Sequence, residues 1–208
     1  MKKLGVVTVT MMLAIALLAG CSSEPSKPAE KPLPKPPDFI TGRSAFQKLY
    51  GAAHGWAPDA QPFRIESHLT ADSKGQGGKS AVWRASFASP TQQHAKPYEW
   101  SGEDAHDAPA RGVSPGVEDS YTPSNSSTQV FDVGFIKVDS DQAFEMAQKH
   151  GGDKLLEKNP DTPVLYLLDW SRPTSQLIWH VFYGPSRDDA KLKVDVNGTT
   201  GEFIGVEK

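Results

Sequence analysis

The segment Gly112–Gly116 has the G-x-S-x-G spacing of a nucleophile elbow, in which a serine attacks an ester or amide carbonyl. In such an elbow, the residue after the serine donates its backbone N–H to the developing oxyanion. That residue is Pro115 here, and proline has no backbone N–H. The segment also lies in a proline-rich loop, with no strand predicted before it and no helix after it. The sequence therefore predicts that Ser114 is not catalytic.

Acidic residues and a histidine gather between Glu103 and Asp107, and such side chains are ligands of divalent metals. A zinc site needs ligands in a fixed geometry, such as two histidines four residues apart on a helix. The sequence has no such histidine pair and contains a single cysteine, Cys21. We therefore interpret the segment as a solvated acidic loop, and the sequence predicts no metal site and no cofactor.

Cys21 has a different chemical role, because it follows an N-terminal processing signal. Two lysines form the positive start of that signal, and Leu4–Leu18 is an uncharged apolar stretch, short for a membrane span. Leu18–Cys21 resembles the bacterial lipobox, which implies cleavage before Cys21 and lipidation of its thiol. We expect residues 1–20 to be a lipoprotein signal peptide and the mature chain to be anchored in a membrane through Cys21.

Residues 21–38 are interpreted as the lipidated cysteine followed by a tether. Repeated prolines favour an extended polyproline II conformation, and the lysines and glutamates between them keep the stretch hydrated. With Cys21 lipidated, no thiol is left for a disulfide or a nucleophile. The anchor implies a location in the cell envelope. Ser22 resembles the sorting signal for the outer membrane, which implies a position facing the periplasm if the cell is diderm.

The charge balance argues against nucleic acid as a partner. The chain has a formal net charge of −3, and loss of the two signal-peptide lysines lowers it to −5. Binding to a phosphate backbone needs clustered lysine and arginine side chains. A mildly acidic folded part lacks that property, so we set nucleic acid aside.

Beyond the tether the chain is built twice, in residues 39–102 and 128–208, with an exposed loop at 103–127 between the copies. The best match aligns Trp83–Gly102 with Trp179–Gly198 without a gap, at a constant offset of 96. Each copy is interpreted as a helix followed by three or four antiparallel strands. The predicted fold class is α+β, with two helix-plus-antiparallel-sheet repeats.

Two helices are predicted from apolar residues that recur at helical spacing. These residues are Ala45, Phe46, Leu49, Tyr50, Ala53, Ala143, Phe144 and Ala147. Asp139, with Gln142 three residues later, has the spacing of a capping box and should start the second helix. Each helix is expected to end at a histidine-glycine pair, at 54–55 and at 150–151, where the glycine can turn left-handed.

Strands are predicted in segments rich in β-branched and aromatic residues, among them 62–69, 128–138 and 163–170. A further strand alternates cleanly from Leu192 to Val196, which is typical of a half-exposed antiparallel strand. The glycine-rich turn that follows should lead into a last strand at 202–206.

Trp83 and Trp179 occupy matching strand positions, and we assign both to the helix-facing side of the sheet. Ile178, His180 and Phe182 alternate with Trp179 and should therefore lie on the opposite face. If no other layer covers that face, these residues form an exposed apolar patch, and such patches commonly bind a partner. Ile178, His180 and Phe182 are thus the candidate binding face.

The second copy ends in a pattern that resembles the PepSY family. That family ends in an aromatic-bearing strand, an alternating strand that closes in an aspartate, a Thr-Gly turn and a short apolar strand. Trp179, Asp195, Thr200 and Gly201 occupy those places. The first copy has Glu99 in place of Asp195 and lacks the Thr-Gly turn. The resemblance implies a small, non-catalytic α+β domain of secreted and envelope proteins, with roles that include restraining peptidases.

These observations together predict a non-enzymatic envelope lipoprotein that binds or inhibits a protein or peptide partner. One alternative is a carrier of a small apolar ligand held between helix and sheet, and a cavity in the fold would favour it. Another alternative is an envelope hydrolase, but the sequence displays no convergent set of serine, histidine and acid.

Overall fold

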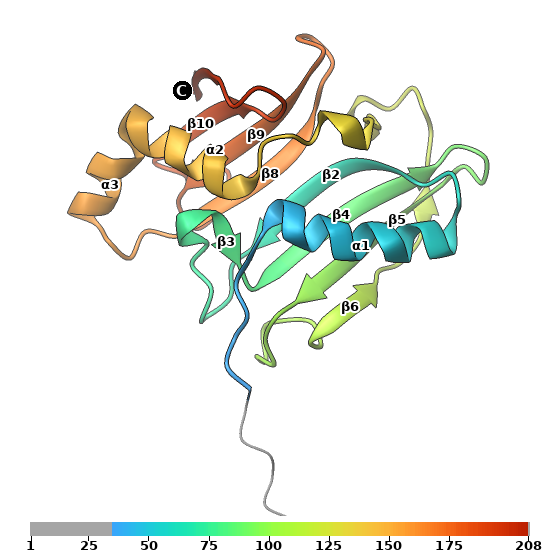
Figure 1. Ribbon diagram of the computed structural model, residues 1–208, viewed down its shortest axis with the longest axis horizontal. Coiled ribbons are helices and arrows are strands. Elements are labelled where there is room, and N and C mark those ends of the chain that lie inside the picture. The colour runs from blue at the N-terminus through green and yellow to red at the C-terminus, as the bar shows by residue number, and fades with distance from the viewer. Residues whose placement is uncertain (1–34, 208) are drawn as a thin grey trace, which may run out of the picture. The chain divides into compact units, whose positions relative to one another are not determined.

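The computed structural model describes residues 35–207 (Figure 1). The predicted signal peptide, the predicted lipidation site Cys21 and most of the predicted tether lie outside these residues. Within residues 35–207, no helix combines the length and the apolar character needed to cross a membrane.

The fold is α+β, as predicted, with helices packed on an antiparallel sheet that has nine strands in the described residues. The strand order is β11-β10-β9-β8-β2-β4-β5-β6, and β7 also pairs with β5; β1 and β3 form a separate small sheet. The strands are β1 (Ile40–Thr41), β2 (Gln61–His68), β3 (Lys79–Ser80), β4 (Val82–Ser89), β5 (His94–Ser101), β6 (Gly112–Pro115), β7 (Asp119–Ser120), β8 (Val164–Ser171), β9 (Gln176–Tyr183), β10 (Leu192–Asn197) and β11 (Phe203–Glu207).

The helices lie on one face of the large sheet. They are α1 (Gly42–Trp56), α2 (Ser140–Ala147) and α3 (Asp153–Lys158), with 3-10 segments η1 (Gln76–Gly78), η2 (Ser126–Thr128) and η3 (Val133–Phe135) and a π-helical turn η4 (Gln148–Gly152). α1 packs against β4 and β5, and α2 packs against β9 and β10 (Figure 1). None of α1, α2 and α3 covers the opposite face, which we call the open face.

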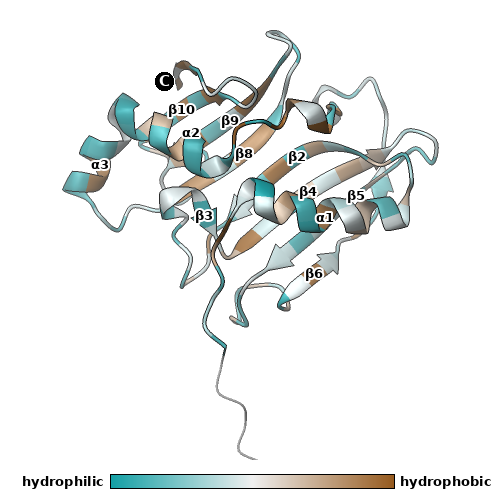
Figure 2. Cartoon of the chain, in the orientation of Figure 1, coloured by the Kyte–Doolittle hydropathy of each residue, from teal (hydrophilic) through white to brown (hydrophobic). Residues whose placement is uncertain are grey.

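The two repeats form one continuous sheet, joined where β2 pairs with β8. The strand pairing keeps the predicted offset of 96, because Trp83 pairs with Trp100 and Trp179 pairs with Val196. Buried side chains from both repeats belong to one apolar core, and brown apolar segments of the strands lie beneath the helices (Figure 2). The two repeats therefore share a core.

Trp83 and Trp179 are both completely buried on the helix-facing side of the sheet, which confirms their predicted position. The Trp83 indole donates to the carbonyl of Ile40 at 2.9 Å, and the Trp179 indole donates to the carbonyl of Val138 at 3.0 Å. Each acceptor comes directly before the residue that caps the N-terminus of α1 or α2. Each tryptophan therefore fixes where its repeat's helix begins.

The N-termini of α1 and α2 meet above these tryptophans. The rings of Trp83 and Trp179 pack edge to face with their centres 6.4 Å apart. Gly42 lies directly over them, and a Cβ atom at that position would come within 2.8 Å of the Trp179 ring. Asp139 forms the predicted capping box with Gln142 and also accepts a hydrogen bond from Thr41, the N-cap of α1. One carboxylate thus serves the first turns of both helices.

The predicted helix ends are correct only for the second repeat. α1 continues through Gly55 to Trp56, because the partly buried Trp56 packs against the core. Gly151 does take a left-handed conformation, with φ of 113°. Helical structure then resumes in α3, which was not predicted, because Leu155 and Leu156 pack against the core.

The strand predicted over residues 128–138 is wrong. The chain forms η2 and η3 there, and Asp132 turns it by accepting a hydrogen bond from the Gly134 amide at 2.6 Å. Phe131 and Ile136 are nevertheless buried. Their apolar character reflects packing from an irregular segment, which an alternating pattern cannot distinguish from a strand.

The predicted exposed loop at 103–127 contains two short strands, β6 and β7, which both pair with β5. Ser114 lies within β6, opposite Glu99, and no helix follows it. A nucleophile elbow needs a sharp turn from a strand into a helix. The G-x-S-x-G segment instead forms an edge strand, where a proline such as Pro115 is tolerated.

Glu103 also differs from the predicted solvated loop, because only 1% of its surface is exposed. The neighbouring Gly102 is held from two sides: its amide donates to the carbonyl of Ala81, and its carbonyl accepts from the Asp38 amide. The end of the tether therefore packs against this turn, next to the buried Glu103.

Candidate functional site

The open face carries a row of charged side chains rather than the expected exposed apolar patch. Ile178 and Phe182 do point to this face, but each exposes only 5% of its surface. The Arg187 guanidinium lies 6.0 Å from the centre of the Phe182 ring, and the His180 ring stacks beside it at 6.1 Å. Polar side chains flank these apolar residues. The groups that solvent or a partner can reach on this face are therefore mainly charged. The binding role of Ile178, His180 and Phe182 stays a prediction.

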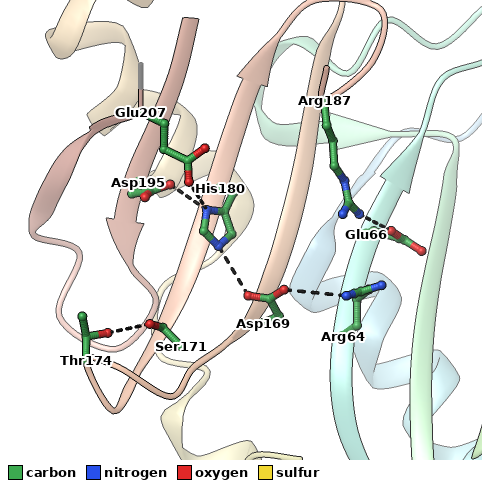
Figure 3. Close-up of polar contacts among 9 residues, drawn as sticks. All are labelled: Arg64, Glu66, Asp169, Ser171, Thr174, His180, Arg187, Asp195 and Glu207. Carbon is green, nitrogen blue, oxygen red and sulfur yellow. Dashed lines mark hydrogen bonds and ion pairs between the residues drawn. The ribbon is translucent and has the colours of Figure 1, made fainter. Parts of the chain in front are cut away.

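His180 lies at the centre of this ionic row, between aspartates on the two neighbouring strands (Figure 3). Its Nδ1 atom is 2.6 Å from Asp195 Oδ1 on β10, and its Nε2 atom is 3.4 Å from Asp169 Oδ1 on β8. Antiparallel pairing places His180 directly opposite Asp195. The sheet, rather than a loop, therefore fixes the orientation of the imidazole ring.

Opposing effects set the protonation of His180. Burial disfavours the charged ring, but the hydrogen bonds and negative charges of Asp169 and Asp195 together outweigh it and raise the pKa to about 9. At neutral pH the ring is therefore an imidazolium that donates to both carboxylates. Asp195, a residue of the PepSY-like pattern, thus has an electrostatic role.

The ionic row continues across the joint between the two repeats (Figure 3). The second oxygen of Asp169 lies 3.9 Å from Arg64 on β2. Beside it, Arg187 from the β9–β10 connection donates to Glu66 on β2 at 2.6 Å. These contacts link side chains that lie far apart in the sequence, and they brace the open face where β2 pairs with β8.

Glu207 adds a third carboxylate to His180 from the last strand, β11. Its Oε1 atom is 3.9 Å from His180 Nδ1, and nearly half of its side chain is exposed. The sequence analysis identified Asp195 but not Asp169 or Glu207. Alternation along β10 and β11 could have placed Glu207 on the open face, but its distance from His180 also depends on the pairing register.

Thr200 and Gly201 of the PepSY-like pattern lie in the turn that leads into β11. Asn197 accepts hydrogen bonds from the amides of Thr199 and Thr200. Gly201 adopts φ of 79°, a left-handed conformation that favours glycine. Together with the buried Trp179, Thr200 and Gly201 therefore have structural roles.

β11 is the outer strand of the sheet, and it exposes apolar side chains. Phe203, Ile204 and Val206 expose 37%, 40% and 45% of their surfaces. Phe203 stacks on the His150 ring with centres 3.6 Å apart. Ile204 lies at an irregularity in the pairing with β10. Among residues 35–207, no strand pairs with the outer edge of β11.

Aromatic side chains fill the space between helices and sheet. A carrier of a small apolar ligand would need a cavity in that space. Phe87 and Tyr183 are fully buried there, with the two tryptophans. An open depression of about 350 Å³ lies at the end of α1, and its lining includes the polar residues His54, Asp59 and Gln61. It also has apolar lining residues, among them Val130 and Phe131, but it is open to solvent rather than enclosed.

No protein-family model matches this chain, and no curated protein matches it. Its structure is similar to the crystal structure of a "putative lipoprotein" from Clostridium difficile 630, with a TM-score of 0.51. The two sequences are 13% identical, and the similarity covers 78% of this chain and 91% of the other. This likeness shows a shared fold.

Proposed function

We propose that this protein is a non-enzymatic lipoprotein of the cell envelope that binds an extended segment of a protein or peptide along β11. The lipobox-like sequence before Cys21 supports the lipid anchor. The similar fold of the C. difficile protein, itself described as a putative lipoprotein, is consistent with it. The PepSY-like residues support a non-catalytic role in the envelope.

The exposed apolar edge of β11 is the observation that carries the binding proposal. An outer strand presents backbone donors and acceptors that can pair with another chain, and most proteins protect such edges with charges, proline or short length. The opposite edge strand, β6, has only four residues and contains Pro115. β11 has five residues, no proline and three exposed apolar side chains. It is the less protected edge.

Strand addition on β11 fits a particular kind of partner. Backbone pairing would supply affinity, and the side chains of Phe203 and Val206 would contact alternate residues of the added strand. Glu202 and Glu207 lie at either end of this apolar run. The favoured partner is therefore an extended segment with apolar residues at its centre and basic residues at its ends. In an envelope peptidase, such a segment would make binding inhibitory.

The binding test compares variants at the two edges. The full-length chain in detergent is used to capture partners from envelope extract, beside Val206→Lys on β11 and Val113→Lys on β6. A partner retained by the wild type and by Val113→Lys but lost with Val206→Lys supports the proposal. Hydrogen exchange should then show slower exchange of β11 amides in the complex. A partner lost only with Val113→Lys contradicts it.

The lipid anchor has its own test. Cys21→Ser removes the thiol that carries the lipid, so the protein should move from the detergent phase to the aqueous phase on phase separation. Ser22→Ala leaves the thiol in place and should partition like the wild type. Unchanged detergent partitioning of Cys21→Ser would contradict lipidation.

A further inference from the structure

Three potential metal ligands converge on the open face from three adjacent strands. His180 on β9, Asp195 on β10 and Glu207 on β11 each offer one ligand atom, and these atoms all lie within 4.8 Å of one another. The three strands are consecutive in the sheet, and each hydrogen bonds to the next. The backbone positions of the three ligands are therefore fixed by regular structure.

We propose that His180, Asp195 and Glu207 bind a divalent metal ion of the zinc type. Ligands about 2.0–2.1 Å from a tetrahedral zinc are roughly 3.3 Å apart. The Nδ1 atom of His180 lies 2.6 Å from Asp195 and 3.9 Å from Glu207, on either side of that value. Small side-chain movements therefore suffice. One nitrogen and two carboxylate oxygens suit zinc, and water from the solvent-exposed side completes the site.

The far side of the imidazole ring is arranged as metal-binding histidines require. A histidine that binds a metal through one nitrogen usually donates its other N–H to a carboxylate, which orients the ring. Asp169 lies at that nitrogen, Nε2, and Arg64 lies near the second oxygen of Asp169. When the metal binds, the Nδ1 proton leaves to solvent and the Nε2–H remains directed at Asp169.

The charges around the site also favour a divalent cation. Asp169, Asp195 and Glu207 contribute three negative charges, while Arg64 and Lys193, which pairs opposite Glu207, contribute two positive charges. With His180 neutral, the group keeps a net charge of −1, which attracts a divalent cation. The matching position of the first repeat does not offer this set, because Arg84 and Glu99 replace His180 and Asp195, and Ser114 lies next to them on β6.

The test is zinc binding by the tag-free full-length chain in detergent, after treatment with EDTA. Calorimetric titration with Zn²⁺ should show one site, and Co²⁺ should give the visible absorption of a tetrahedral complex. Glu207→Gln and His180→Gln should abolish that site. Asp169→Asn should weaken zinc binding about 10-fold to 100-fold, because it removes the carboxylate that orients the ring.

Two control variants keep the assignment specific. Glu99→Gln removes the matching carboxylate of the first repeat, and His94→Gln removes another histidine that faces a carboxylate, Glu118. Both should bind zinc like the wild type. Glu207 is partly exposed near the chain end, so Glu207→Gln should melt at the same temperature as the metal-free wild type. The proposal is overturned if the wild type binds no zinc, if Glu207→Gln binds it equally well, or if Ca²⁺ binds in preference.

Discussion

The two repeats keep the same tryptophan where they face the helices and carry different charged pairs where they face solvent. Trp83 and Trp179 occupy equivalent strand positions, are equally buried and make equivalent indole hydrogen bonds. On the open face, the cross-strand pair of the first repeat is Arg84 with Glu99, and the pair of the second is His180 with Asp195. The buried tryptophan position is therefore common to both repeats, while the open-face pair differs in its chemistry.

The pair of the first repeat keeps its charges at all physiological pH values, whereas the pair of the second repeat contains a histidine that can lose a proton. Arg84 donates to Glu99 at 2.8 Å, and a guanidinium keeps its charge at all physiological pH values. His180 can lose a proton, and the second repeat adds Glu207 from a longer edge strand. The second repeat therefore carries both proposed binding features, while the first repeat mainly completes the sheet and the core.

The equivalence of the two tryptophans predicts the largest effect. Trp83→Ala and Trp179→Ala should each lower the free energy of unfolding by about 3–5 kcal/mol, because each leaves a large cavity in the shared core. Urea denaturation of the two variants measures this directly. If one variant loses less than about 1 kcal/mol, the two repeats do not contribute equally to the core.

The difference between the pairs on the open face predicts that the free energy of unfolding depends on pH through His180. The pKa of His180 is raised in the folded chain to about 9 from 6.5, so its stabilisation is complete below about pH 6.5 and lost as pH rises through 9. The loss between these values should be up to about 3 kcal/mol at 1.36 kcal/mol per pH unit. Unfolding is measured at each pH with EDTA present. His180→Gln should remove this dependence, and an equally steep dependence in that variant would contradict it.

The meeting point of the helices predicts a smaller, steric effect. Gly42→Ala should cost about 1–3 kcal/mol, because the added methyl group would press on the Trp179 ring. Gly51→Ala in the same helix has open space at its Cβ position and should be neutral or stabilising. Thermal melting compares the two variants. Equal melting temperatures would mean that the tryptophans can shift to make room.

The two helix caps predict the smallest effect. Asp139→Ala should lower stability by about 0.5–2 kcal/mol and more than Thr41→Ala, since both variants lose the Thr41–Asp139 hydrogen bond but only Asp139 also accepts from the Arg43 amide of α1. Urea denaturation of both variants and the double variant measures each contribution. Equal losses would show that the hydrogen bond from the Arg43 amide to Asp139 adds no stability.

Much of the fold follows from the sequence, and the errors have a common cause. Alternation along β9 and β10 and the capping box at Asp139 depend on neighbouring residues, so both were predictable. The strand predicted at 128–138 failed because Phe131 and Ile136 are buried by distant parts of the chain. The helix end expected at Gly55 failed for the same reason, since packing of Trp56 extends α1.

The candidate site likewise has features that the sequence predicted and features that depend on distant parts of the chain. The sequence placed Ile178, His180 and Phe182 on one face, because side chains alternate along a strand. It could not show that Phe182 lies beneath Arg187, since the connection that carries Arg187 folds back over the sheet. The sequence did not predict that Asp169 and Glu207 lie near His180, because their positions depend on how the strands on either side of β9 pair.

The sequence by itself determined the lipobox-like signal and the inward-facing tryptophans, because each depends on residues close together along the chain. It also determined the internal repeat, because two segments of one chain can be compared residue by residue. The tertiary structure alone decided that β2 pairs with β8, that the two helix N-termini share Asp139, and that three strands bring ligands to His180. The physical reason is that these contacts join residues far apart in sequence. Their geometry is set by strand register and by a core that both repeats fill together.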